Sequence, residues 1–314
     1  MIYPANFEQK VGFDRLREQV AALCTIRGGR ERLCAEQFST SQADVERRLA
    51  LADEMRRLLE MERDFPDDEF VDVDYILSKL KIEGSFLEVE EVVLLRRALA
   101  SAGAIAGFIL GRGEELYPEL RLRSRGIEAF PEIVRAIDGI VDQYGKIRDD
   151  ASPELQQIRR MIREREGQAA KRLQQVLSNA KKAGIVEADA MLSIRDGRIP
   201  VAAANKRKLQ GFIHDESATG KTFYVEPVEV VEINNELKEL EYAERREIVR
   251  ILSAFTDSIR PEADRIALIG DYLSDLDMIR AKARWAVANG AVKPIVSTDD
   301  RLVLRNARHP LLQQ

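Results

Sequence analysis

Residues 192–227 read LSIRDGRIPVAAANKRKLQGFIHDESATGKTFYVEP, and the rest of the chain is organised around them. Short runs of strand-forming residues alternate here with turn residues. One turn is predicted at Asp196-Gly197, a dipeptide suited to a two-residue hairpin, and another at Thr219-Gly220. The pattern indicates about four strands, a sheet too small to bury much surface by itself. The predicted strands are Met191–Arg195, Ile199–Ala204, Leu209–His214 and Thr222–Val225.

On both sides of this stretch the apolar pattern becomes helical. Ser152, Pro153 and Glu154 form a strong helix start, with an N-cap, a proline at the first helical position and an acid beside the helix dipole. Apolar residues then recur from Leu155 to Ala180 at a coiled-coil-like spacing, and Gly184 ends the helix. A second apolar seam runs from Val230 to Ile259, before Pro261. The pattern predicts a sheet inserted between two antiparallel helices.

The charges of the two helices favour this pairing. Residues 154–182 contain eight basic and three acidic residues, whereas residues 228–258 contain eight acidic and four basic ones. Exposed ion pairs contribute only ~0.2–1 kcal/mol each. We therefore expect the apolar seams to supply most of the stability and the charges to select the partner.

The rest of the chain predicts a helical body, with helices at residues 7–24, after Ser41, and at 71–80, 87–110, 131–141 and 263–289. The helical pattern is expected to be interrupted, or to give way to a loose turn, at Arg27-Gly28-Gly29-Arg30. Residues 292–305 are expected to be strand-rich. The predicted fold class is mainly α, a helical core with long antiparallel lever helices that carry a small inserted antiparallel β clamp. The expected domains are a helical core at 1–152, an ascending lever helix at 153–183, the β clamp insertion at 184–227, a returning lever helix at 228–260, and a return to the core with a strand-rich lead at 261–314.

The composition narrows the functional class. A net charge of −5 argues against a uniformly basic coat for nucleic acid, so any such binding must be local. Cys24 and Cys34 have no metal or redox spacing, which favours a reduced cytoplasmic setting. The N-terminus has no signal-peptide pattern. The longest apolar run, residues 98–110, is shorter than the roughly 20 residues of a membrane span. We expect no membrane association.

The sequence offers little catalytic chemistry. Gly220-Lys221-Thr222 lacks the early glycine of a phosphate-binding loop and lies between two predicted strands, so a hairpin turn is the better interpretation. His214-Asp215-Glu216-Ser217 contains the ingredients of a triad or a metal site, but adjacent residues on a strand point to opposite faces. Turn-forming polar residues are the favoured interpretation. We predict no catalytic residue, no cofactor-binding residue and no metal ligand in this chain.

Binding to phosphate is the more plausible chemistry. The predicted sheet carries more basic than acidic residues, and the run Lys206-Arg207-Lys208 falls at a turn from which flexible cations could reach a phosphate backbone. A solvated turn without a ligand remains the alternative. The candidate nucleic-acid-binding residues are Arg195, Arg198, Lys206, Arg207, Lys208 and Lys221.

Several segments resemble the MutS family, and specifically its second-type bacterial subfamily, which lacks the mismatch-reading domain. The segments that resemble the clamp, the returning lever helix, the core and the lead into the ATPase domain are GRIPV (197–201), GFIHDESATG (211–220), YVEP (224–227), VEINNEL (231–237), DLDMIRAKAR (275–284) and ARHPLL (307–312). The resemblance covers nearly the whole chain and is strongest from 195 to 312.

The resemblance implies an N-terminal lever and clamp fragment of a longer protein. The longer protein would carry an ATPase domain that binds ATP and Mg, an endonuclease-type C-terminal domain and the homodimer contact. The implied partners are branched DNA, in suppression of recombination, or ribosomal RNA on stalled, collided ribosomes. The fragment itself is expected to be non-catalytic. The alternative is a coiled-coil scaffold whose small sheet docks a protein partner.

Overall fold

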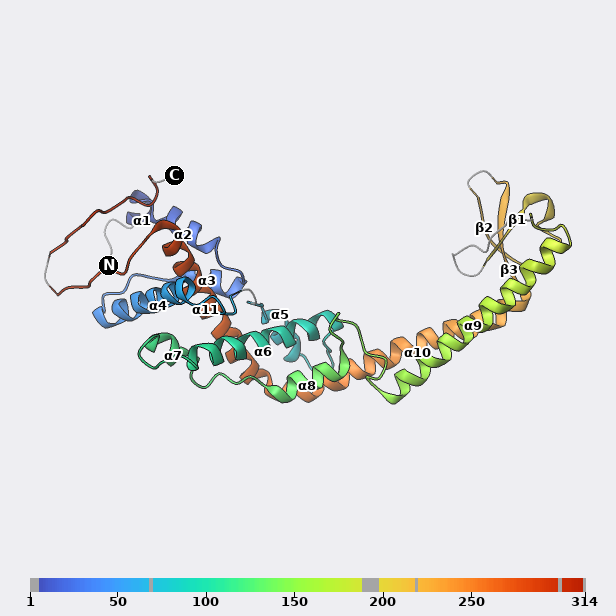
Figure 1. The fold of residues 1–314 in the computed structure, drawn as a ribbon, viewed down its shortest axis with the longest axis horizontal. Coiled ribbons are helices and arrows are strands. Elements are labelled where there is room, and N and C mark those ends of the chain that lie inside the picture. The colour runs from blue at the N-terminus through green and yellow to red at the C-terminus, as the bar shows by residue number, and fades with distance from the viewer. Residues whose placement is uncertain (1–5, 68–69, 188–197, 218–219, 299–300, 313–314) are drawn as a thin grey trace. The chain divides into compact units, whose positions relative to one another are not determined.

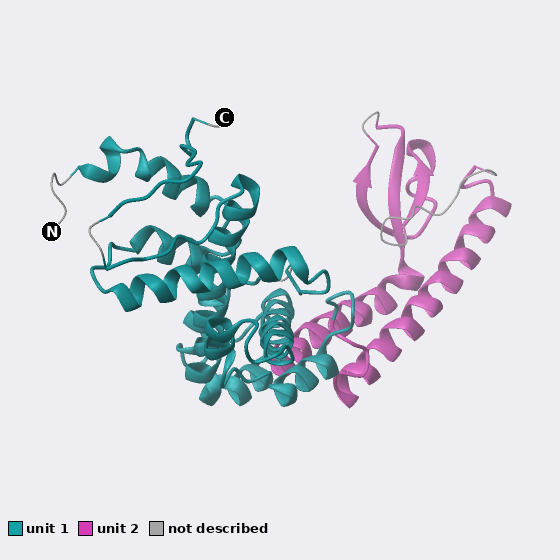
Figure 2. Cartoon of the chain, turned by 60° about the vertical axis from the view of Figure 1, so that its left-hand side comes forward, with its two compact units in different colours: residues 1–146, 252–314 teal, residues 147–251 magenta. Residues whose placement is uncertain are grey.

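The computed structural model describes residues 6–67, 70–187, 198–217, 220–298 and 301–312 (Figure 1). The chain divides into two compact units, residues 1–146 with 252–314, here called the body, and residues 147–251 (Figure 2). The body is helical, and the second unit contains a three-stranded antiparallel sheet between long helices. The predicted fold class, mainly α with a small inserted sheet, is therefore confirmed.

The body is built around α11, which contacts α2 to α6. Its buried residues include Ile266, Leu273, Leu276 and Asp277, so a charged side chain lies among apolar ones. The helices of the body are α1 (Phe7–Lys10), α2 (Phe13–Ala21), α3 (Arg27–Ala35), α4 (Gln42–Met61), α5 (Asp74–Leu80), α6 (Val89–Leu110), α7 (Pro118–Ser124), α8 (Pro131–Ile140) and α11 (Ala263–Asn289).

The expected break at residues 27–30 is wrong, because these residues form the first turn of α3. Asp277 of α11 caps that turn: its carboxylate accepts hydrogen bonds from the backbone N–H groups of Thr25 and Ile26 at 2.8–3.1 Å. Gly28 and Gly29 allow the two helices to approach, since a Cβ on Gly29 would lie 2.6 Å from Asp277 Oδ2. The paired glycines serve helix packing and not a turn.

Two other local predictions for the body also need correction. The predicted helix over 7–24 is divided into α1 and α2 at Gly12, whose φ of +72° a helix does not tolerate. The expected strands in 292–305 do not form in the parts of this segment that the structure describes. Ile295 is 96% exposed there. An apolar alternating segment becomes a strand only beside a hydrogen-bonding neighbour, and no described segment pairs with this one.

Helix α6 is long and apolar enough, by length and composition, to cross a membrane. In the structure Leu95, Leu99 and Ile105 of this helix are fully buried within the protein. The apolar character of α6 is thus that of a helix in a protein core.

In the second unit, α9 (Pro153–Lys182) lies side by side and antiparallel with α10 (Val228–Ile259), whose last residues, from Leu252, belong to the body. Arg159 near the start of α9 pairs with Glu244 of α10, and Arg165, further along α9, pairs with the earlier residue Glu236. The N-cap of α9 is Ser152, whose Oγ accepts a hydrogen bond from Leu155 N at 3.0 Å, as the sequence predicts. Gly184, at φ +65°, follows the end of the helix.

The inserted sheet has the strand order β1-β3-β2, with both pairings antiparallel. Its inner face is closed by the end of α9, because Ile199, Val201 and Val225 are fully buried in one cluster with Leu173 and Val176. The predicted strand Met191–Arg195 and the turn Asp196-Gly197 lie outside the described residues. The strands are β1 (Ile199–Ala202), β2 (Gly211–Glu216) and β3 (Thr222–Pro227).

Candidate nucleic-acid interface

The basic run Lys206-Arg207-Lys208 follows a turn of 3-10 helix that begins directly after β1, at Ala203–Asn205. Lys208 N donates to Asn205 O at 2.8 Å, which closes the turn. The side chains of Arg207 and Lys208 are exposed. These two cations therefore stand on a hydrogen-bonded turn with their charged ends in solvent.

Two further predicted cations lie beside this turn. Lys206 Nζ lies 4.4 Å from the centre of the Phe223 ring, a cation–π contact that holds the ammonium against the sheet. Lys221 is exposed, and its carbonyl oxygen accepts a hydrogen bond from Ala203 N at 2.9 Å. The structure thus brings Lys206, Arg207, Lys208 and Lys221 together, and we call these four residues the tip cluster.

The other two candidates are not part of the tip cluster. Arg198 is half-buried and precedes β1, at the opposite end of that strand from the 203–208 turn. Arg195 lies outside the described residues. A role for these two residues in binding nucleic acid stays a prediction.

The tip cluster is attached to the end of α9. Asn205 Nδ2 donates to the carbonyl oxygen of Ile185, the third residue after α9, at 3.0 Å. Ile185 and Leu209 pack against the apolar cluster that joins the sheet to α9 and α10. The turn that carries the exposed cations is therefore attached to the end of α9 by a hydrogen bond and by apolar packing.

A polar brace, which the sequence analysis missed, fixes the sheet to α10. The ladder between β2 and β3 shifts register between Ile213 and Asp215, so His214 is the extra residue of a bulge. His214 Nε2 shares a hydrogen bond with Glu226 Oε2 at 2.5 Å, and Asn234 of α10 donates to Glu226 Oε1 at 2.5 Å. Burial raises the pKa of Glu226, but the hydrogen bonds from Asn234 and His214 outweigh it, and the pKa lies below its ordinary 4.5.

The residues that superficially suggested catalysis have structural roles. His214 belongs to the brace. Gly220 has a φ of +66° and donates its N–H to Ser217 O at 2.7 Å, which makes the Gly220-Lys221-Thr222 segment part of the β2–β3 hairpin connection. Ser217 Oγ accepts a hydrogen bond from Thr222 N at 3.0 Å. Within the described residues, no group of three or more His, Cys, Asp or Glu side chains is placed to hold a metal ion.

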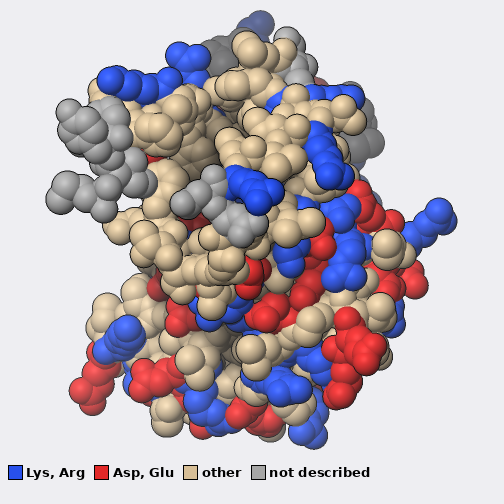
Figure 3. Space-filling model, turned by 90° about the vertical axis from the view of Figure 1, so that its left-hand side faces the viewer, with Lys and Arg blue, Asp and Glu red and all other residues tan. Residues whose placement is uncertain are grey.

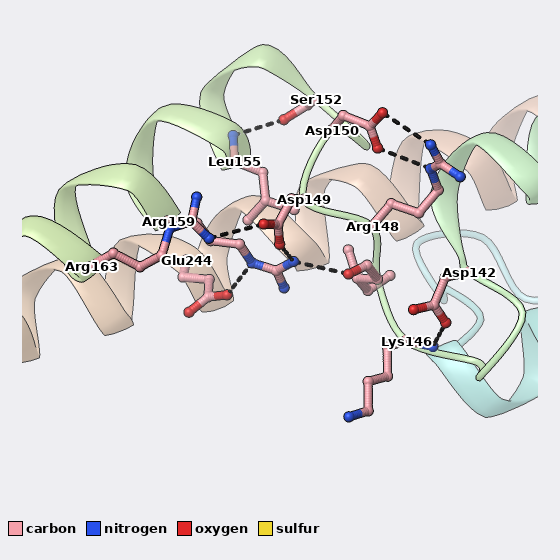
Figure 4. A network of polar contacts seen from close by, with 11 residues as sticks. Asp142, Lys146, Arg148, Asp149, Asp150, Ser152, Leu155, Arg159, Arg163 and Glu244 are labelled. Carbon is pink, nitrogen blue, oxygen red and sulfur yellow. Dashed lines mark hydrogen bonds and ion pairs between the residues drawn. The ribbon is translucent and has the colours of Figure 1, made fainter.

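At the opposite end of the helix pair from the sheet, an ion-pair network joins the start of α9 to α10 (Figure 4). Arg159 is the centre: its guanidinium donates to Asp149 Oδ1 at 2.6 Å, to Glu244 Oε1 at 2.7 Å and to the Ile147 carbonyl at 2.9 Å. Arg163 donates to Asp149 Oδ2 at 2.9 Å. Hydrogen bonds from Arg159 and Arg163 lower the pKa of Asp149. Because Arg159 and Arg163 are already paired with carboxylates of the protein, the network stabilises the contact between α9 and α10 and is not a ligand site.

The body has a basic cleft of about 450 Å³ between α3, α4, α7 and α11. Its cations are matched by carboxylates: Arg48 and Lys282 pair with Glu36, and Arg32 pairs with Asp275. Over the lower part of the face seen in Figure 3, basic and acidic side chains alternate. The tip cluster, where Arg207, Lys208 and Lys221 have no ion pair among the described residues, is the better candidate for a phosphate ligand.

Comparisons with known proteins give a consistent result. No family model matches the chain. The chain is 30% identical over 303 residues to Endonuclease MutS2 of Lacticaseibacillus paracasei. This match covers 96% of the chain and 38% of that protein. It is 31% identical over 307 residues to Endonuclease MutS2 of Pelotomaculum thermopropionicum, with 97% and 39% covered, and 31% identical over 306 residues to Endonuclease MutS2 of a Geobacillus species, with 96% and 39% covered. The chain spans less than two fifths of the length of these curated relatives.

Proposed function

Because this chain is MutS2-like over 96% of its length, we propose that it is the nucleic-acid-embracing lever and clamp of a MutS-like ATPase. In this proposal α9 and α10 are the lever helices, and the sheet between them is the clamp. The clamp grips the phosphate backbone of branched DNA or of ribosomal RNA on a stalled ribosome. The chain itself contributes binding and no chemical step.

The observation that carries the proposal is the tip cluster. The side chains of Arg207 and Lys208 stand exposed on a turn that is hydrogen-bonded to the segment just after the 30-residue helix α9. Phosphate contacts need flexible cations in water, and a grip needs those cations on a fixed support. The turn after β1 supplies both.

We extend the proposal to the whole protein. In it, a separate ATPase domain that binds ATP and Mg drives the clamp, two copies close around the nucleic acid as a homodimer, and the complex works in the cytoplasm. The word endonuclease in the names of the relatives supports an action on nucleic acid. We place any nuclease activity of the whole protein outside residues 1–314.

The test is to replace Lys206, Arg207 and Lys208 together by alanine. We expect binding to four-way-junction DNA or to collided ribosomes to weaken, with the slope of log Kd against log salt reduced by about two to three, since each lost phosphate contact removes about 0.9. Comparison of the two substrates also shows which of them the clamp prefers. Helix content by circular dichroism should not change.

A matched control removes three exposed cations from the body, in Arg15→Ala, Arg30→Ala and Lys81→Ala. It changes the net charge equally and should leave the salt slope within about one unit of the wild type. Equal losses in the two variants would mean that only net charge matters, and the clamp assignment would then fail.

A protein-docking scaffold is the second candidate function, and β2 favours it. This strand lies at the edge of the described sheet, and Phe212 and Ile213 on it are 59% and 49% exposed. An exposed apolar edge strand can pair with a strand of a partner. This function predicts binding that is insensitive to salt and to the triple alanine change, but that is lost in Phe212→Asp.

A further inference from the structure

The outward face of α9, opposite its buried seam, carries a line of cations. Arg160, Lys171 and Lys182 are eleven residues apart, and eleven residues make three turns of an α-helix to within about 20°. The seam residues Leu155, Ile158, Leu173 and Val176 are buried on the other side. We call Arg160, Lys171 and Lys182 the α9 stripe.

The stripe is available to a ligand. All three side chains are exposed, and none of them has an ion pair or hydrogen bond within the described parts of the chain. Arg163 lies on the same face but is paired with Asp149. Glu164 is the single acidic residue on that face between Arg160 and Lys182.

The corresponding face of α10 is different. Opposite the buried residues Val230, Glu247 and Ile251, α10 presents acids and bases together with exposed Tyr242 and Val249. The residues of this face that carry charge are Glu232, Lys238, Glu239, Arg246 and Arg250. The exposed acids Glu229, Glu232 and Glu239 of α10 extend over ten residues, and the bases Arg246 and Arg250 follow on the same side. In a second copy of the chain this short acidic run would match less than half of the 22 residues that the α9 stripe spans.

The stripe continues into the tip cluster. Lys182 is the last residue of α9, and Ile185, three residues later, accepts the hydrogen bond from Asn205 that holds the 203–208 turn. The stripe itself is about 33 Å long at 1.5 Å per residue. One turn of a B-form DNA duplex is about 34–36 Å long.

We propose that the α9 stripe binds the phosphate backbone of a nucleic-acid duplex that runs along the helix for about one turn, from the tip cluster to Arg160. This rests on the proposed function and adds to it a second contact surface, on the side of the lever. The recognised group is the phosphodiester, which DNA and RNA duplexes share, and no base is read.

The experiment compares two triple variants of the 314-residue chain. Arg160→Gln, Lys171→Gln and Lys182→Gln remove the stripe. Lys238→Gln, Arg245→Gln and Arg246→Gln serve as the matched control, since they remove three exposed cations of α10 that form no ion pair or hydrogen bond with the described residues. Affinity for a 30-base-pair DNA duplex and for an RNA duplex of the same length is measured between 50 and 200 mM salt. The stripe variant should lower the salt slope on DNA by about two to three units, and the control by less than about one.

Each outcome decides the proposal. An unchanged slope in the stripe variant, with a reduced slope in the tip-cluster variant, overturns the stripe and leaves the clamp in place. Unchanged slopes in both variants overturn both proposals. Equal reductions in the stripe variant and the α10 control also overturn the stripe, because the effect is then one of net charge. If the triple variant loses helix content, Lys171→Gln alone is used, with an expected loss of about 0.9 on DNA. If the salt slope falls for the DNA duplex alone or for the RNA duplex alone, that duplex is the source of the bound phosphate.

Discussion

Asp277 in the body and Asp149 beside α9 both accept hydrogen bonds from arginine side chains, yet the two carboxylates do different work. Asp277 is fully buried, accepts hydrogen bonds from two backbone N–H groups and from Arg280, and fixes α3 on α11. Asp149 is 53% exposed and joins Arg159 to Arg163 in water. Separating a buried charge from its partners is costly, so Asp277 ties α3 to α11, whereas an exposed charge only biases a pairing that apolar contacts stabilise.

The largest expected effect comes from Asp277→Ala. The change removes the buried carboxylate from the guanidinium of Arg280, itself 1% exposed, which keeps, among the carboxylates of the described residues, only the longer contact with Asp67 at 3.2 Å. It also leaves the N–H groups of Thr25 and Ile26 without the carboxylate that accepts their hydrogen bonds. Breaking a buried pair on one side costs about 3–5 kcal/mol. Urea unfolding should show this loss. Asp149→Ala, the control, should cost less than about 1 kcal/mol, and similar losses in the two variants would remove the distinction between the regions.

Gly29→Ala should have the next largest effect. The new methyl group would lie 2.6 Å from Asp277 Oδ2, so α3 must move away from α11. Overpacking of this kind costs about 1–3 kcal/mol. The free energy of unfolding measures it, and a neutral result would show that α3 is not held as closely as the structure describes.

The brace between the sheet and α10 predicts a pH dependence. Because the pKa of Glu226 is below 4.5 in the folded protein, its stabilisation is complete above pH 4.5 and is lost as the pH falls through the lower folded value. Glu226→Gln should therefore lower the protection of β3 amides from hydrogen exchange at pH 7 by about 1 kcal/mol. At pH values below the folded pKa, wild type and variant should be alike. A difference that persists there would assign the effect to packing.

The smallest effect has the opposite sign. Gly167 lies in the middle of α9, and a Cβ added to it meets no atom within 4 Å. Gly167→Ala should stabilise the helix by about 0.5–1 kcal/mol, since the unfolded chain loses freedom and nothing clashes. Thermal unfolding measures the gain. Together with Gly29→Ala, this change separates a glycine required by packing from one that is not.

Local signals predicted the second unit well. Ser152 and Pro153 set the start of α9, Gly184 follows its end, and Gly220 marks the connection between β2 and β3. These features are decided by residues close together in the sequence, which is where capping and turn chemistry act.

The misses depend on residues far apart in the sequence. Gly28 and Gly29 predicted an interruption of the helical pattern, because the sequence does not show that Asp277, about 250 residues later, accepts the hydrogen bonds at the start of α3. The apolar residues around Ile295 read as a strand, but no described segment pairs with them. In the candidate site, the basic run was found from its charge alone. The contact of Lys206 with Phe223, the anchor of Asn205 on Ile185 and the brace at Glu226 need the register of the sheet.

The eleven-residue spacing of the α9 stripe limits how the length of this helix can change. Deletion of a single residue between Arg160 and Lys171 would turn the two cations apart by about 100° and would rotate the apolar seam off α10 by the same angle. Loss of seven or eleven residues, matched by an equal loss from α10, keeps the seam facing its partner and the remaining cations in line. Relatives with shorter or longer arms should therefore differ from this chain by whole multiples of these repeats.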